Sequence, residues 1–362
     1  MKTDFTVLKP KIKNFKAYVP MFWYICLFCI EDIKILVYNY TVFCILGEFI
    51  MTKIDLITGF LGVGKTTFIK RYADYLTSRG EKVHIIENDF GGLPIDAREL
   101  DNEDFDVSQI TGGCMCCTGR ESFKNLLLRA GKLGYDRVLV EPSGIYDVNE
   151  FFKMIQNPPV SSLCEVGNVI TIADSKSDDI LSDEARALMF SQLIFTGCVI
   201  LSKSQMRNQE EIDAAIDDLQ GILDENKSTR NLRSENICIE KPWDEFDDSD
   251  FELVSKCGYV PAEHVSVVAD HMSIFSASIM CGKFDTMEHL NEILHDLLNT
   301  EKYGKVYRIK GYISDVNDKW YEINCSSSGC FVNETKVPRG LFIVIGQGYD
   351  EEAIKKLFIS RR

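Results

Sequence analysis

Residues 59–66 read Gly-Phe-Leu-Gly-Val-Gly-Lys-Thr, and this segment indicates the class of fold. It fits the pattern G-x4-G-K-[ST], in which a glycine-rich loop wraps a phosphate group. A β-rich run over residues 53–58 precedes the loop, and apolar residues recur at helical spacing over residues 66–79. Because a strand, a glycine-rich loop and a helix follow one another, the stretch predicts a P-loop rather than an incidental glycine-rich turn.

Each residue type in this loop suits a phosphate. Gly59 and Gly64, helped by Gly62, can adopt backbone angles that a side chain disfavours, so successive amides form an anion nest. Lys65 is expected to reach the β- and γ-phosphates. The Thr67 hydroxyl either contacts the α-phosphate or satisfies the first helical turn. The predicted nucleotide-binding residues here are Gly59, Gly62, Val63, Gly64, Lys65, Thr66 and Thr67, with Thr66 also a ligand of Mg²⁺.

Carboxylates follow two further strand patterns. Glu141 ends an apolar run over residues 137–141, where it can hold a Mg²⁺-bound water or orient the attacking water, and the sequence leaves both roles open. Residues 87–96 contain two glycines together with Asp89 and Asp96. This segment either orders around Mg²⁺ and the γ-phosphate or is an ordinary Gly/Pro turn.

Three cysteines, Cys114, Cys116 and Cys117, lie in a glycine-flanked loop between a strand and a helix. Their thiolates suit Zn²⁺, Cu⁺ or Co²⁺. Three protein ligands leave one position for Asp89, water or a ligand from a partner, which favours transfer over storage. A redox switch and plain burial of the thiols are the alternatives. The other cysteines lack ligand spacing and are expected to be core or incidental residues.

Composition limits the partners. The 362 residues carry a formal net charge of −15, which argues against nucleic acid or an anionic membrane as a partner. The 13 cysteines in a chain of this length indicate a reducing compartment, so we expect a cytoplasmic protein.

The first fifty residues contain two short apolar runs, each below the roughly 18 residues of a spanning helix. Basic residues before the first run suggest a signal peptide, but no small-x-small cleavage site follows. Gly47-Glu48 can be encoded as a purine-rich ribosome-binding sequence, so we expect translation to begin at Met51. Residues 1–50 would then be upstream DNA that was wrongly included in the coding sequence. The alternative is a disordered N-terminal extension.

Strand and helix patterns alternate from residue 53 to about residue 225, which predicts an α/β fold with a mostly parallel sheet covered by helices on both faces. We expect a P-loop domain over residues 51–240 and a linker over residues 241–262, where a proline and a run of acids break the periodicity. A strand–helix–strands–helix series then predicts a small α+β domain over residues 263–362.

The combination of G-F-L-G-V-G-K-T-T, E-N-D-F-G, G-G-C-M-C-C and E-P-S-G resembles the CobW-type metallochaperone GTPases, relatives of HypB and UreG. The likeness covers about residues 52–346, and the later R-I-K-G and F-I-V-I-G resemble the family's CobW C-terminal domain. It implies GTP hydrolysis with Mg²⁺, and zinc or cobalt bound for delivery to a client. It also implies these roles: Lys65 and Thr66 bind phosphate and Mg²⁺, Asp96 is the switch I aspartate, Glu141 is the Walker B glutamate, and Cys114, Cys116 and Cys117 bind metal.

Two positions depart from the family pattern. Asp89 replaces the glutamate of N-E-F-G and is one methylene shorter. The guanine motif N-K-x-D appears as Ser202-Lys203-Ser204-Gln205, where Lys203 can still stack along a base but a neutral amide replaces the charged acceptor. Whether GTP or ATP is preferred therefore stays open.

The sequence thus predicts an NTP hydrolase that acts as a metallochaperone for a client metalloprotein. One alternative is an NTP-dependent reactivation or assembly factor for a metallo- or corrinoid enzyme, and another is a nucleotide-binding thiol sensor. A homo-oligomer is compatible with each of these.

Overall fold

The computed structural model describes residues 51–88, 105–110, 115, 119–176, 181–235, 237–262 and 274–359. The chain divides into two units, residues 1–50 and residues 51–362, and the architecture below belongs to the second. The expected extension over residues 1–50 lies outside the described residues. In the part of the chain that is described, no helix combines the length and apolarity needed to cross a membrane.

The first half of this unit contains a seven-stranded sheet with the order β3-β2-β4-β1-β5-β6-β7. Every neighbouring pair of strands is parallel, as the alternating pattern predicts. The strands are β1 (Thr52–Thr58), β2 (Val83–Asn88), β3 (Asp106–Ile110), β4 (Arg137–Glu141), β5 (Cys164–Asp174), β6 (Cys198–Ser202) and β7 (Cys238–Ile239).

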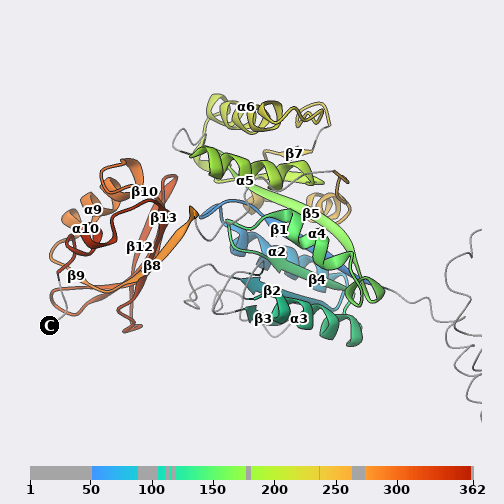
Figure 1. The fold of residues 1–362 in the computed structure, drawn as a ribbon, viewed down its shortest axis with the longest axis horizontal. Coiled ribbons are helices and arrows are strands. Elements are labelled where there is room, and N and C mark those ends of the chain that lie inside the picture. The colour runs from blue at the N-terminus through green and yellow to red at the C-terminus, as the bar shows by residue number, and fades with distance from the viewer. Residues whose placement is uncertain are drawn as a thin grey trace, which may run out of the picture. The chain divides into compact units, whose positions relative to one another are not determined.

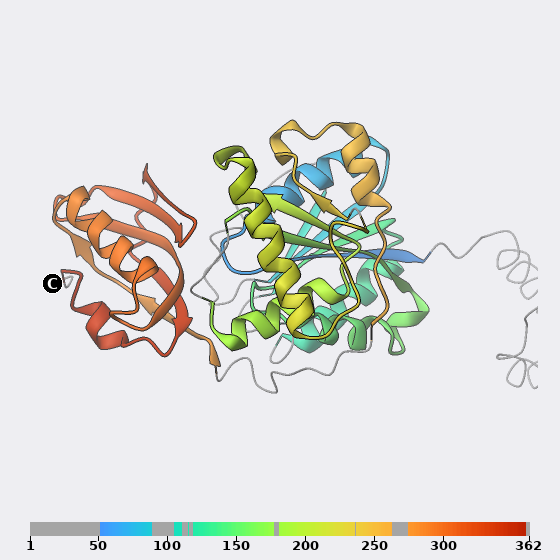
Figure 2. The same ribbon diagram turned by 90° about the horizontal axis from the view of Figure 1, so that it is seen from above.

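Helices cover both faces of this sheet (Figure 2). They are α2 (Lys65–Ser78), α3 (Arg120–Lys132), α4 (Val148–Ile155), α5 (Asp183–Ile194), α6 (Gln209–Glu225) and α7 (Asp248–Ser255). Successive residues of a strand point to opposite faces. In β1, Ile57 therefore packs with Phe68 of α2 in one core, whereas Leu56 packs with Leu127 of α3 in another.

Residues 241–262 differ from the expected linker. A 3-10 helix spans Trp243–Glu245, and α7 follows it. Two acids of the acidic run cap α7. Asp247 accepts hydrogen bonds from the first turn of the helix, and Asp250 completes the capping box. Phe251 then stacks on Tyr72 with ring centroids 6.4 Å apart, so this segment belongs to the P-loop core.

A second, largely antiparallel sheet forms the C-terminal region, with the order β12-β11-β10-β13-β8 and the short β9 parallel to β10 (Figure 1). Its strands are β8 (Ser276–Met280), β9 (Lys283–Phe284), β10 (Lys305–Asp315), β11 (Trp320–Ser326), β12 (Gly329–Thr335) and β13 (Phe342–Gln347). Helices α9 (Met287–Asn299) and α10 (Glu351–Lys355) accompany it.

Strand β13 is buried on both of its faces. Phe342 and Val344 pack with α9 in the C-terminal core, whereas Ile343 and Ile345 belong to the core that contains the P-loop. The continuous apolar run at residues 342–345 is what a strand buried on both faces requires. The predicted α/β fold and the additional α+β region are therefore confirmed, while β12, which has no buried residue, was not expected from the sequence.

Candidate nucleotide and metal site

The residues of the site converge because parallel strands end at one edge of the sheet. Strand β1 lies between β4 and β5, so the loop that follows Thr58 lies beside Glu141 and Asp174. Strand β6 ends one position further along, at Ser202. Ligands of open α/β sheets bind at this carboxyl edge.

The loop over residues 59–66 has the backbone that a phosphate nest needs. Gly59, Gly62 and Gly64 have φ angles of 143°, 76° and 93°, which favour glycine. A Cβ on Gly59 would lie 2.2 Å from the carbonyl oxygen of Ile172, so this glycine is also required by the close approach of β5. Lys65 is buried, and its Nζ donates to the carbonyl oxygen of Gly59 at 2.9 Å. The ammonium group thus lies within the curve of the loop.

Glu141 lies against Thr66, the residue that follows the P-loop lysine. The Thr66 hydroxyl Oγ1 donates to Glu141 Oε1 over 2.9 Å. The turn after Glu141 approaches the P-loop equally closely, because a Cβ on Gly144 would lie 2.6 Å from the backbone nitrogen of Leu61. A hydroxyl and a carboxylate held together are oxygen donors of the kind that Mg²⁺ prefers, so these residues fit that ion.

Lys203 also lies against the P-loop. Its Nζ donates to the Gly62 carbonyl oxygen at 3.4 Å and to Asp174 Oδ2 at 2.7 Å. These bonds hold its ammonium group between the P-loop and the end of β5. Gln205 is exposed in the 3-10 turn Ser204–Met206 that follows.

Two residues at this edge were missed by the sequence analysis. Asp174 pairs with Lys203, and the end of the β5 run was its only signal. Trp243 folds back from the end of β7, so that a Cβ on Gly64 would lie 2.9 Å from the edge of its indole ring. Arg71 fixes it by donating from Nη1 to the Trp243 carbonyl oxygen at 2.6 Å. The available hint was that Trp243 is one of only three tryptophans in the sequence.

The predicted metal loop is described at one residue only. Asp89, Asp96, Cys114, Cys116 and Cys117 lie outside the described residues, and within the described ranges no three His, Cys, Asp or Glu residues form a metal-binding group.

Met115, at the centre of the C-M-C-C motif, is described and buried. Its backbone nitrogen donates to Asn88 Oδ1 at 3.1 Å, and Asn88 Nδ2 donates to the Ile110 carbonyl oxygen at 3.1 Å. One asparagine at the end of β2 therefore holds both β3 and the centre of the motif.

The other cysteines divide into two kinds. Among the described residues, the free cysteines include Cys164, whose burial raises its thiol pKa to about 11 and makes it a core residue. Cys325 and Cys330 instead form a disulfide bond across β11 and β12. The bond was not predicted, because strand β12, which places the two residues opposite each other, was itself not expected.

Fold and site together define a P-loop nucleotide-binding domain. Residues 53–230 match the family model described as CobW/HypB/UreG, nucleotide-binding domain, and this part of the chain belongs to that family.

Three relatives are similar to the chain. It is 33% identical over 135 residues to the zinc chaperone CobW of Pseudomonas aeruginosa, covering 34% of this chain and 35% of that protein. It is 31% identical over 188 residues to the zinc chaperone YeiR of Escherichia coli, covering 50% and 54%. It is 23% identical over 319 residues to the zinc-regulated GTPase metalloprotein activator 1 of Schizosaccharomyces pombe, covering 74% and 73%. The chain thus spans 35% and 54% of the length of the two bacterial relatives.

Proposed function

We propose that this chain is a GTP-hydrolysing metallochaperone, which binds Mg²⁺–nucleotide through residues 59–66 and carries zinc or cobalt on Cys114, Cys116 and Cys117 to a client metalloprotein. One observation carries the proposal. Glu87 in β2 lies in register beside Glu141 in β4, and the next residue of β2, Asn88, holds Met115. Neighbouring strands therefore hold the carboxylate that contacts Thr66 and the central residue of the metal motif.

The P-loop residues would position the triphosphate. Lys65 places its positive charge inside the loop, where it can hold β- and γ-phosphate oxygens, and the N-terminus of α2 adds its positive end. Thr66 and Glu141 would hold Mg²⁺, which supplies charge neutralisation at the phosphates when bound. Glu141 would also orient the attacking water, and Asp96 would act as the switch I aspartate.

GTP is the nucleotide that we propose, since one similar relative is named a zinc-regulated GTPase metalloprotein activator. The contact between Lys203 and Gly62 supports a base site beside the loop. At Gln205 an amide offers one neutral acceptor, and ATP is therefore the alternative nucleotide.

Zinc or cobalt is the proposed cargo. Two similar bacterial relatives are named zinc chaperones, and thiolates are the ligands that these metals prefer. We propose that Asp89 or a group on the client fills the remaining ligand position. The C-terminal sheet would correspond to the CobW C-terminal domain.

The test is a titration of the reduced protein, kept anaerobic, with Zn²⁺ and with Co²⁺ while GTP and ATP hydrolysis are recorded. We expect thiolate-to-cobalt charge-transfer bands that saturate near one equivalent, and a hydrolysis rate that responds to the metal. Cys116→Ala should remove both responses and leave nucleotide binding intact.

Cys281→Ala is the matched control, because Cys281 is an exposed free thiol outside the motif. It should behave as the wild type. Nucleotide turnover with no thiolate–metal signal would reject the metallochaperone and leave an NTPase that acts on protein clients. The absence of turnover with either nucleotide would reject the enzymatic half of the proposal.

A further inference from the structure

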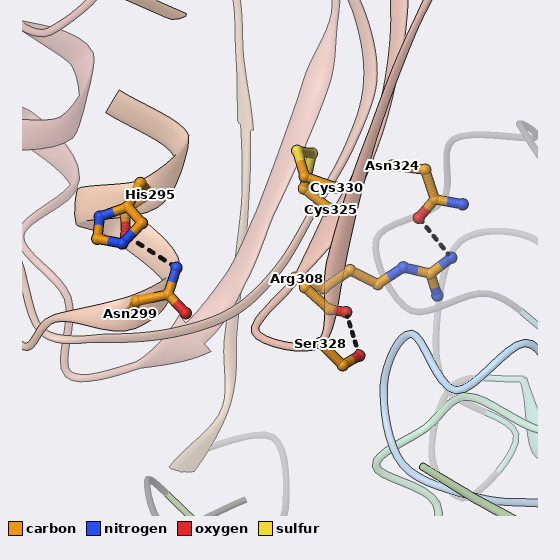
Figure 3. The surroundings of a disulfide bond; sticks show 8 residues. His295, Asn299, Arg308, Asn324, Cys325, Ser328 and Cys330 are labelled. Carbon is orange, nitrogen blue, oxygen red and sulfur yellow. Dashed lines mark hydrogen bonds between the residues drawn. A yellow bond between two sulfur atoms is a disulfide. The ribbon is translucent and has the colours of Figure 1, made fainter. Parts of the chain in front are cut away.

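The hairpin of β11 and β12 carries the disulfide bond close to its tip. Cys325 pairs with Cys330 and Ser326 pairs with Gly329, which leaves Ser327 and Ser328 as the turn. Figure 3 shows the two sulfur atoms joined between these strands, with Ser328 close by. The bond therefore fixes the ends of a four-residue segment, residues 326–329.

This segment touches the candidate nucleotide site at three points. Ser328 Oγ accepts a hydrogen bond from Lys203 Nζ, the group that also contacts the P-loop. The carbonyl oxygen of Ser327 accepts from Lys176 Nζ at 3.3 Å. A Cβ on Gly62 would lie 3.0 Å from Ser326 Cβ, so Ser326 packs directly on the P-loop.

Aromatic packing beside the turn supports the same arrangement. Phe60, the second residue of the P-loop, meets Tyr307 of β10 edge-on with ring centroids 5.3 Å apart. It also lies 6.5 Å from Phe275. A small cavity of about 50 Å³ is lined by residues of the P-loop, the end of β5 and the turn. The turn therefore closes one side of the P-loop.

The two cysteines differ in exposure. Cys325 is buried, whereas Cys330 is exposed at the edge of the sheet. Because Cys330 is the more exposed residue, a dissolved thiol would attack at this cysteine and Cys325 would be the leaving thiolate. Strand β12 contributes no buried residue, so little apolar packing holds it in place once the covalent link is cut.

We propose that the segment 326–329 is a lid on the nucleotide site and that the Cys325–Cys330 bond sets how firmly it is held. This inference rests on the proposed nucleotide site. In the oxidised protein the bond restricts the turn to the position in which Ser328 holds Lys203. A dithiol reductant breaks the S–S bond: its two thiols are oxidised to a disulfide, and two electrons and two protons pass to Cys325 and Cys330. The freed turn then leaves Lys203 more often, and bound nucleotide is released faster.

The test measures release of N-methylanthraniloyl-GDP from the full chain after a chase with excess unlabelled GDP, before and after treatment with dithiothreitol. We expect release to become roughly tenfold faster on reduction, which is the change in rate expected when one charge-assisted hydrogen bond is lost. Alkylation of both cysteines, read by mass spectrometry, confirms that the bond was cut. The double variant Cys325→Ser/Cys330→Ser should release the nucleotide fast under both conditions.

Further variants keep the result interpretable. The cysteines of the metal motif remain in the double variant, so a response that persists there would come from them and would overturn the inference. Ser328→Ala should speed release in the oxidised protein, even if the double variant folds poorly. Cys281→Ser should respond to dithiothreitol as the wild type does. Equal release rates from oxidised and reduced wild type would overturn the lid alone, whereas failure to bind nucleotide in either state would overturn the nucleotide site and the lid with it.

Discussion

Thr66 and Glu141 are joined by a hydrogen bond of 2.9 Å between Oγ1 and Oε1, although 75 residues separate them in the sequence. The first residue follows the P-loop lysine, and the second ends the neighbouring strand β4. This pair unites the groups that we propose for metal binding and for orientation of water.

We therefore expect Glu141→Gln to lower the GTP turnover number by roughly a hundredfold or more, while nucleotide still binds. The amide keeps the size of the side chain and loses the charge that orients water or holds Mg²⁺. Steady-state hydrolysis and equilibrium binding check the two halves of this prediction. Glu252→Gln, an exposed acid on α7, should leave both unchanged. Normal turnover in the Glu141→Gln variant would remove this residue from the mechanism.

Gly144→Ala should weaken both the fold and nucleotide binding. The new Cβ would lie 2.6 Å from the Leu61 nitrogen and 2.8 Å from Leu61 Cα, and backbone atoms cannot move aside as a flexible side chain can. We expect a loss of about 1–3 kcal/mol in the free energy of unfolding, together with weaker nucleotide binding.

Gly221→Ala is the matched control for that variant. Gly221 lies within α6, and nothing approaches its Cβ position within 4 Å. Because alanine favours a helix, it should stabilise the protein by about 0.5–1 kcal/mol. Thermal unfolding of the two variants, compared with the wild type, should give shifts of opposite sign. A neutral result for Gly144→Ala would mean that the turn can retreat from the P-loop.

Asp55→Ala should be among the most destabilising single changes in the P-loop core. Asp55 is fully buried and accepts from Arg137 Nη1 at 2.8 Å and from the Tyr72 hydroxyl at 2.8 Å. Its removal leaves buried donors unsatisfied and strips Arg137 of one carboxylate. We expect a loss of about 3–5 kcal/mol in the free energy of unfolding, measured by chemical denaturation. Arg233→Ala, which breaks exposed ion pairs and an exposed hydrogen bond to the Asp213 carbonyl oxygen, should change the free energy of unfolding by about 0.5 kcal/mol or less.

Gln205→Asp should restore discrimination between guanine and adenine. The change supplies a charged acceptor two residues after Lys203, in an exposed turn that tolerates it. We expect the ratio of kcat/KM for GTP over ATP to rise roughly tenfold or more. Met206→Asp adds the same charge at the next exposed position and should leave the ratio unchanged. An equal rise in both variants would show a general effect of charge.

The sequence predicted what depends on local pattern. The P-loop could be recognised because loop, strand and helix are neighbours in the chain, and Glu141 because it ends an apolar run. The contact between Lys203 and Ser328 could not be predicted, since 125 residues separate them and no sequence pattern links the two positions. Trp243 was hidden in the same way, because its packing on Gly64 depends on how the segment after β7 returns to the loop.

Strand β12 was missed for a different reason. Its residues Gly329–Thr335 include no buried side chain, so the strand shows neither of the hydrophobic patterns that identify strands. It is held by its backbone pairing with β11, by the disulfide bond and by the partly buried Val332. A prediction that lacks β12 has no reason to place Cys325 opposite Cys330, so the disulfide bond could not be predicted either.

The edge-on contact between Phe60 and Tyr307 bears on how such chains can be recombined. The sequence of a phosphate-binding loop is normally constrained by the nucleotide that it binds. Here Phe60 of the loop must also pack against Tyr307, which lies in the C-terminal sheet. A chimera that joins residues 51–262 to the C-terminal region of a relative would inherit only one member of this pair. The two regions should exchange successfully only when the donor brings an aromatic or bulky apolar residue to the position of Tyr307, so they are expected to change together during divergence.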